Sequence, residues 1–256
     1  MMKTGIGWYP FSLFGLENIK LYKHFEQEKQ IQMKLTQITF DIPLTAYQIP
    51  QFRGAMVAML GRENDRFHNH DGEKNYHYRY PRVQYRQKAG RASLVMIGER
   101  EQNLEDVGKI TAQTGRSIQI GDQEYKLYLH GMSTKDFDPK ITETPLSYRL
   151  HHWIALNREN YAYWQEHTGL TKRMQLLERL LPNHIMQFAK GVSWYPEAQL
   201  EVEIISLDKM KFLRLHGVKH LTFDLTFKVN AELPYQIGLG KGVTYGFGIL
   251  KSQRKR

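Results

Sequence analysis

The feature that most restricts how this chain can fold is a glycine-rich segment near its C-terminus. Residues 238–248 contain five of the chain's 20 glycines, around a central Lys241. They follow Leu221–Val229, where apolar and polar residues alternate strictly, as in a strand with one buried face. Glycine is needed where φ is positive or where another segment approaches too closely for a Cβ. The pattern predicts a tight loop beside a sheet. Its N–H groups could form a concavity for phosphate, and a glycine-rich hairpin between edge strands is the simpler alternative.

Charge and composition narrow the class of partner. The 256 residues carry a formal charge of +10, which favours a polyanionic partner such as a nucleic acid. Cysteine is absent, which excludes disulfides and thiolate metal sites and favours an intracellular, cytoplasmic protein. No segment reaches the ~20 apolar residues needed to cross a bilayer, so we expect no membrane association.

Residues 1–32 are expected to be an N-terminal extension outside the fold. Trp8–Leu16 is apolar and aromatic, but no small-residue cleavage site follows, which makes it a poor signal peptide. A strand pattern begins at Met33, so the folded part, or the true start of the chain, is expected there.

The next part of the chain predicts an N-terminal domain over residues 33–145. Strands are expected at 34–40, 78–88 and 92–97, helices at 46–60 and 101–114, and a hairpin at 117–129. The second helix is expected to bury Leu104, Val107 and Ile110. This order of elements is that of a ferredoxin-like unit. Prolines and turn residues between 136 and 145 predict the domain boundary.

Residues 146–256 predict a second α/β domain of related build. Helices are expected at 147–164 and 170–188, and strands at 200–206, 211–215, 221–229 and 249–250. The aromatic residues that recur at helical spacing in both helices are interpreted as core.

The segment 78–88 alternates between two kinds of side chain. One face is aromatic and cationic; it carries Tyr78, Tyr80, Arg82, Gln84, Arg86 and Lys88. Such a face can stack on bases and bind phosphates, although an ordinary solvated face shows the same alternation.

His68 and His70 are the candidates for chemistry. If residues 66–70 are extended, both imidazoles lie on one face, where one can act as general base and the other as general acid. Two alternatives stay open. The histidines could be surface residues without a role, or metal ligands with a third ligand from Asp71 or His77.

In the acid–base interpretation the substrate is RNA. One imidazole deprotonates a 2′-OH, and the other protonates the leaving 5′ oxygen. The nearby cations Lys74, Arg79 and Arg82 could stabilise charge on the phosphorane.

Motifs in both halves together resemble a known family. The pattern Gly238-x-Gly240, followed by Gly246-Phe247-Gly248, is similar to the C-terminal glycine signature of the CRISPR-associated repeat-processing endoribonucleases, the sixth Cas family. Residues 49–54 (IPQFRG), 67–71 (FHNHD) and 78–85 (YRYPRVQY) resemble its subtype I-B-like branch. The resemblance covers about residues 33–250.

This resemblance implies an α+β fold of two tandem ferredoxin-like (RRM-like) domains, with RNA held along a cleft beside the glycine loop. It implies cleavage of CRISPR precursor transcripts within the repeat, without a metal or other cofactor. Attack by the 2′-OH gives 5′-OH and 2′,3′-cyclic phosphate ends. The two closely spaced histidines implicated in this branch map onto His68 and His70. We expect His70 to be the base and His68 the acid, although the two roles could be exchanged.

The resemblance and the charge pattern also predict an RNA-binding surface. Its expected residues are cationic or belong to the glycine loop: Arg53, Lys74, Arg79, Arg82, Arg86, Gly238, Gly240, Lys241, Gly246 and Gly248. The expected partners are CRISPR repeat RNA, as precursor and as mature crRNA, and other Cas subunits of an interference complex. Relatives of this fold also bind RNA without cutting it, so a non-catalytic repeat-RNA-binding subunit is the alternative function.

Overall fold

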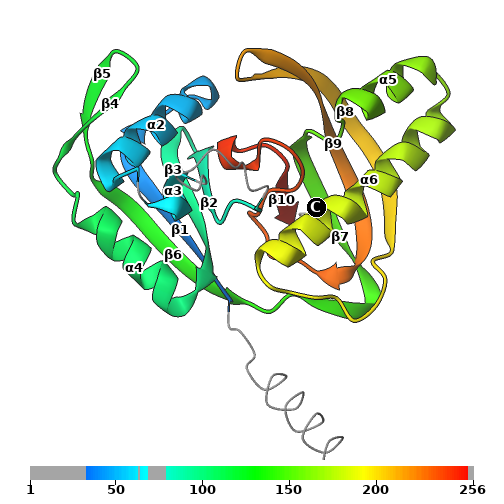
Figure 1. Cartoon of the computed structure of the whole chain (residues 1–256), viewed down its shortest axis with the longest axis horizontal. Helices are drawn as coiled ribbons and strands as arrows, with labels where there is room; N and C mark the ends of the chain where they lie inside the picture. The colour runs from blue at the N-terminus through cyan, green and yellow to red at the C-terminus, as the bar shows by residue number, and fades with distance from the viewer. Residues whose placement is uncertain (1–32, 63, 69–78, 253–256) are drawn as a thin grey trace, which may run out of the picture. The chain divides into compact units, whose positions relative to one another are not determined.

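The N-terminal lobe is a four-stranded antiparallel sheet with helices on one face (Figure 1). The computed structural model describes residues 33–62, 64–68 and 79–252. The sheet has the order β2-β3-β1-β6. Its strands are β1 (Met33–Pro43), β2 (Val83–Lys88), β3 (Arg91–Glu99) and β6 (Leu129–Phe137). The helices are a 3-10 turn η1 (Ala46–Gln48), α2 (Ile49–Leu60), the short α3 (Asp65–His68) and α4 (Arg100–Thr111). A small hairpin, β4 (Ser117–Ile120) and β5 (Gln123–Lys126), follows α4.

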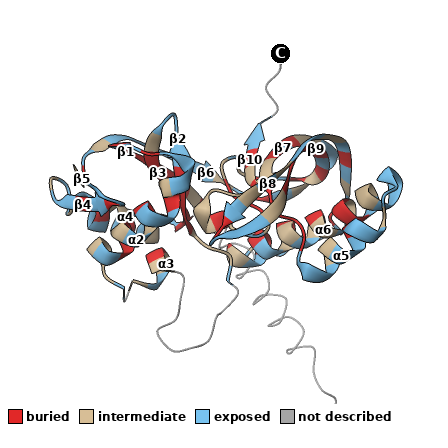
Figure 2. Ribbon diagram, turned by 90° about the horizontal axis from the view of Figure 1, so that it is seen from above, coloured by how far each residue is buried: buried red, intermediate tan, exposed pale blue. Residues whose placement is uncertain are grey.

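The C-terminal lobe repeats this plan. Its sheet has the order β10-β7-β9-β8, again antiparallel. The strands are β7 (Lys140–Trp153), β8 (Val202–Leu215), β9 (Val218–Glu232) and β10 (Ile249–Ser252). The helices are α5 (Arg158–Glu166) and α6 (Leu170–Gly191), and a 3-10 turn η2 (Val243–Tyr245) lies in the glycine loop. Figure 2 shows the helices of each lobe on one side of its sheet.

Both lobes place the first and third strands of the unit at the centre of the sheet. This is the ferredoxin-like order, and it confirms the expected α+β fold with two such domains. In the C-terminal lobe the glycine loop stands between β9 and β10, where the N-terminal lobe has α4. The loop is therefore the connection that completes the second domain.

The sequence of α2 explains both its start and its buried face. Pro50 lies in the first turn, where its missing N–H costs no hydrogen bond. Ile49, Phe52 and Met56 recur at helical spacing and are buried. The helix ends at Gly61, whose φ of 92° favours glycine.

The buried face of α4 differs from the expectation. Leu104 is 61% exposed, whereas Asn103 and Asp106 are buried with Ile110. Asn103 Nδ2 donates to the carbonyl oxygen of Lys34 (2.9 Å), and Asp106 pairs with Arg66 (2.7 Å). Polar contacts with β1 and α3 therefore set the orientation of the helix, and the prediction that Leu104 packs inward was wrong.

The predicted helix at 147–164 begins as strand and is helical only in its last part. β7 continues to Trp153, and α5 begins only at Arg158. Tyr148 and Leu150 alternate into the core, and an irregularity of register follows between Leu150 and Trp153. That bulge puts buried residues at a spacing that resembles a helix in the sequence.

The boundary between the lobes and two strands also differ from the prediction. The chain changes sheets between Phe137 and Lys140, so residues 140–145 belong to the second lobe rather than the first. The strand that completes the N-terminal sheet is β6, not the hairpin at 117–129. The strands predicted at 200–206 and 211–215 are one continuous strand, β8.

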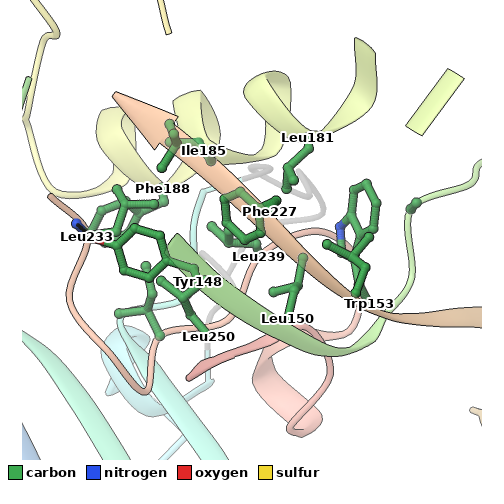
Figure 3. Close-up of a cluster of buried hydrophobic side chains, with 14 of the residues drawn as sticks. Tyr148, Leu150, Trp153, Leu181, Ile185, Phe188, Phe227, Leu233, Leu239 and Leu250 are labelled. Atoms are coloured by element: carbon green, nitrogen blue, oxygen red, sulfur yellow. Dashed lines mark hydrogen bonds between the residues drawn. The ribbon is translucent and has the colours of Figure 1, made fainter. Parts of the chain in front are cut away.

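One hydrophobic core is shared by the two lobes. Val95 and Ile97 of β3 belong to the same buried cluster as Phe188 of α6. Figure 3 shows the C-terminal part of this cluster, in which Leu239 of the glycine loop lies with Tyr148 of β7. The chain from Met33 onward accordingly forms one compact unit. No helix among the described residues is long and apolar enough to cross a membrane.

Candidate nucleic-acid interface

The glycines of the loop stand where a Cβ would collide with other parts of the protein. A Cβ on Gly248 would lie 1.9 Å from the carbonyl oxygen of Leu239, and a Cβ on Gly240 would lie 2.7 Å from Nε1 of Trp153. Both glycines also have positive φ, 64° and 85° respectively. At Gly238 the nearest atom is Cγ1 of Val243, at 2.6 Å. Close packing within the chain therefore requires these glycines.

The N–H groups of the loop are largely used inside the protein. Leu239 N donates to Gly248 O (2.9 Å), and Gly248 N donates to His152 O (3.1 Å). Lys241 N donates to the carbonyl oxygen of Ile154 (3.2 Å). The amides of 238 and of 245–247 are also bonded within the chain. The expected concavity of free amides is therefore wrong for these positions, because their N–H groups bond to residues 152 and 154, to Gln84 or to other residues of the loop.

Two side chains of the loop nevertheless face outward or toward the N-terminal lobe. Lys241 is exposed. The Tyr245 ring makes an edge-on contact with His216 (4.7 Å between ring centroids), in the turn between β8 and β9. The guanidinium of Arg53, on α2, lies 5.5 Å from the centroid of the same ring. Tyr245 thus connects the loop to α2.

Arg53 in turn contacts His68. Its Nη2 donates to the carbonyl oxygen of His68 (2.5 Å), at the end of α3. The neighbouring Phe67 is buried, and its carbonyl oxygen accepts a hydrogen bond from the Tyr85 hydroxyl (3.2 Å). Arg53 Nε is buried and has no hydrogen-bond partner among the described residues. These contacts place His68 beside the point where the loop meets the N-terminal lobe.

The expected extended conformation around His68 is wrong for the described residues. Asp65–His68 is a short helix, so the side chains follow helical rather than alternating directions. His70 and Lys74 lie outside the described residues.

A cationic cavity of 560 Å³ lies beside α3. Four basic side chains, Arg66, Arg79, Arg82 and Lys190, line it, together with Asp65. Burial is the main cause that lowers the pKa of Arg82, and repulsion from Arg66 and Arg79 lowers it further against the opposing effect of Glu99. A phosphate in this cavity would relieve that repulsion.

Two of these arginines are held in place by specific hydrogen bonds. Arg66 Nε pairs with the buried carboxylate of Asp106 (2.7 Å), and its Nη1 donates to Oε1 of Gln102 (2.8 Å). Arg82 Nε donates to the carbonyl oxygen of Gly191 (2.9 Å). Arg79 is exposed. The cavity thus combines two fixed cations with two solvent-exposed ones.

Arg86 does not lie on an open face. It is only 2% exposed, and its Nη1 lies 3.4 Å from Oε1 of Gln236 in the other lobe. Gln84 is fully buried, and the Tyr80 hydroxyl donates to Gly238 O (2.8 Å). Tyr80, Gln84 and Arg86 of the face predicted for 78–88 therefore pack between the lobes, because β2 is the edge strand against which the segment 236–238 lies. Lys88 is exposed, and Tyr78 lies outside the described residues. Burial lowers the pKa of Arg86 to about 10.

Arg66, Lys190, His216 and Tyr245 were not identified from the sequence. Lys190 lies on α6 and Arg66 on α3, and only the tertiary structure brings them together. Tyr245 lies inside the glycine motif, and an aromatic residue next to Gly246 is the one signal that could have drawn attention to it.

No group of three or more metal-ligating side chains is found in the described ranges 33–62, 64–68 and 79–252.

Comparisons with known proteins identify the family. Residues 31–138 match the model of the Cas6b N-terminal domain, and residues 140–253 match that of the Cas6b C-terminal domain. A structure described as Cas6b is 20% identical, with a TM-score of 0.77, covering 87% of this chain and 100% of the other. A CRISPR RNA processing endoribonuclease Cas6b is also 20% identical, with a TM-score of 0.64, covering 86% of this chain and 98% of the other.

A curated relative matches part of the chain. An uncharacterized protein of Methanocaldococcus jannaschii, MJ0978, is 27% identical over 135 residues, which is 52% of this chain and 90% of that protein. The two domain matches span almost all of the described residues, and the chain therefore belongs to the Cas6b family.

Proposed function

We propose that this Cas6b protein is a metal-independent endoribonuclease that cuts CRISPR precursor transcripts within the repeat. The 2′-OH next to the scissile phosphate attacks it, and the products carry 5′-OH and 2′,3′-cyclic phosphate ends. The observation that carries the proposal is the position of His68. Its carbonyl oxygen is bonded to Arg53, whose guanidinium lies beside Tyr245 of the glycine loop.

In this mechanism His68 and His70 divide the proton transfers. One imidazole removes the proton of the 2′-OH, and the other donates a proton to the 5′ oxygen as the P–O bond breaks. The guanidinium of Arg53, held by the carbonyl oxygen of His68, supplies positive charge near the phosphate. Lys241 and the cavity formed by Arg66, Arg79, Arg82 and Lys190 bind further phosphates along the RNA.

We assign the loop glycines and Arg86 a structural rather than a contacting role. The glycines allow the loop to pack against Trp153 and Leu239, and Arg86 is buried between the lobes. The proposed RNA contacts are therefore side chains that surround the loop. We also propose that the protein binds other Cas subunits. We propose that it acts in the cytoplasm, where the transcript is.

Single-turnover cleavage of repeat RNA in EDTA tests the proposal. We expect His68→Ala and His70→Ala each to slow cleavage by about a hundredfold or more while repeat RNA still binds, since positioned acid–base groups contribute about 10²–10⁴-fold. His167→Ala, a substitution of a half-buried histidine directly after α5 in the C-terminal lobe, is the control. Analysis of the product ends should find 5′-OH and cyclic phosphate.

The same assay separates the alternatives. Intact RNA after incubation with the wild-type chain, despite tight binding, would favour the non-catalytic RNA-binding subunit. Loss of cleavage in EDTA with rescue by a divalent ion would contradict the metal-independent mechanism. Cleavage that survives both histidine substitutions would exclude these residues from the chemistry.

A further inference from the structure

A second cluster of ionisable side chains lies on the C-terminal sheet, on the face opposite its helices. Phe223 and Leu225 of β9 point into the core shared with α6, so Asp224 between them points the other way. The bulge in β7 brings His151 and His152 opposite Asp224. His152 has a φ of 53°, which is uncommon for a residue other than glycine.

The carboxylate of Asp224 holds this bulge. It accepts the backbone N–H of His152 (2.6 Å), and its oxygens lie 3.9 Å from Nδ1 of His151 and 4.0 Å from Nε2 of His152. The backbone carbonyl of His152 accepts the N–H of Gly248. The two imidazoles are thus fixed directly beside the glycine loop.

Three lysines surround the histidines. Lys209 of β8 is paired in register with Asp224, Lys211 with Thr222, and Lys251 of β10 with Arg149. Among the described residues, no carboxylate lies within salt-bridge distance of these lysines; Arg149 pairs with Asp208 (3.3 Å). Burial lowers the pKa of His152, and all three lysines lower it further against the opposing effect of Asp224.

We propose that this open face is a second phosphate-binding surface for the RNA strand that passes the glycine loop. Lysines and imidazoles recognise phosphates, and the cluster, as far as the structure describes it, contains no Phe, Tyr or Trp ring on which a base could stack. Lys241 pairs with Ile154, the residue directly after β7, so the surface continues directly from the loop. A phosphate here would neutralise the charge of the lysines. This inference rests on the proposed RNA function. It is tested by measuring RNA binding, without a cleavage assay.

Two matched triple variants test this surface. Lys209→Ser/Lys211→Ser/Lys251→Ser removes its three lysines. Lys109→Ser/Lys126→Ser/Lys172→Ser removes the same charge from α4, β5 and α6. The full chain and both variants are titrated with a fluorescent oligouridylate of about 18 nucleotides, longer than the ~4–16 nucleotides that one single-strand-binding fold covers. The titration is repeated over a range of salt concentrations.

We expect the open-face variant to lower the slope of log K against log salt by about 2, since each single-strand phosphate contact contributes about 0.7. Its Kd at low salt should rise by about tenfold or more. The control variant should keep the wild-type slope, and thermal unfolding should show that both variants are folded. Equal slopes for the two variants would overturn the inference.

This outcome is independent of the proposed cleavage. A chain that binds through the open face but leaves repeat RNA intact would refute the cleavage proposal and support this surface. A chain that cuts repeat RNA while both triple variants bind alike would refute this surface alone.

Discussion

Gly248 has a φ of 64°, and the site of its absent Cβ is 1.9 Å from the carbonyl oxygen of Leu239. Its N–H also bonds to His152 in β7. The residue therefore joins the loop to the sheet through the backbone, at a point too narrow for any side chain. The role of this glycine is explained by packing and needs no contact with RNA.

Alanine substitution should show that packing requires glycine at position 248 but not at an exposed position elsewhere. We expect Gly248→Ala to lower the free energy of unfolding by at least about 2 kcal/mol, because it adds strain at positive φ and a clash with backbone. Gly108→Ala is the control: it lies exposed in α4 with nothing within 4 Å of a Cβ. It should stabilise the protein by about 0.5–1 kcal/mol. Urea unfolding measures both, and a mild effect at Gly248 would contradict the packing role.

His184 is the residue for which we expect the clearest effect of pH on stability. It is partly buried on α6, and its Nδ1 accepts a hydrogen bond from Nε1 of Trp153 (3.1 Å). Burial lowers its pKa from 6.5 to about 4. Between these values the unfolded chain binds a proton that the native protein does not. His184 therefore contributes fully above about pH 6.5, and this stability is lost as pH falls toward 4.

The size of this effect follows from the shift in pKa. The loss should approach about 3 kcal/mol near pH 4. His184→Gln retains a side-chain acceptor for Trp153 but does not titrate, so its stability should fall less between pH 7 and 4. His167→Gln, at a half-buried histidine directly after α5, serves as the control. Parallel curves for wild type and His184→Gln in urea unfolding would show that His184 does not contribute.

At the scale of elements, the sequence predicted most of the strands and helices because their periodicity is local. β9, α2 and α6 follow from alternation or helical spacing alone. β7 could not be predicted, since its bulge at 151–152 is held by Asp224 on a neighbouring strand. The buried face of β2 was missed for a similar reason, because the segment that covers it comes from the other lobe.

The candidate site was predicted only in part. Arg53, Lys241 and His68 could be chosen from motif and charge, and the structure brings Arg53 and His68 together through a backbone hydrogen bond. The cavity lined by Arg66, Arg82 and Lys190 required the tertiary packing that brings α3, the residue before β2 and the end of α6 around one space. Spacing along the chain carries no information about that packing.

The position of α3 should depend on the Tyr85 hydroxyl. Tyr85→Phe keeps the buried ring but loses the hydrogen bond to Phe67 O, next to His68. We expect a loss of about 1 kcal/mol in stability and a clear slowing of repeat RNA cleavage. Tyr148→Phe is the matched control, because it also loses a buried hydroxyl, which bonds to Leu233 N and Ala231 O, but in the other lobe.

The two tyrosine variants are compared by urea unfolding and single-turnover cleavage. Tyr148→Phe should lose similar stability and keep the wild-type cleavage rate. If both variants slow cleavage equally, the hydroxyl of Tyr85 has no specific role in holding His68.

At the scale of the whole molecule, the shared core makes the two lobes one cooperative unit from Met33 onward. Val95 and Ile97 belong to the N-terminal sheet but are buried in the cluster that contains Phe188. The polar contacts of Tyr80, Gln84 and Arg86 also cross between the lobes. Separating the lobes would expose this apolar surface and leave buried polar groups unpaired.

We therefore expect a single unfolding transition in calorimetry, with equal van't Hoff and calorimetric enthalpies. Two resolved transitions, one for each lobe, would contradict this expectation.

The glycine loop also determines when the protein can work. It supplies Leu239 to the core, Tyr245 to Arg53 and the N–H that fixes His152, yet it comes after nearly all other residues in the chain. During synthesis, the N-terminal lobe with His68 emerges long before this loop does. A ribosome-bound chain that has not reached Gly238 therefore has an incomplete site, and under the proposed function it would leave transcripts uncut.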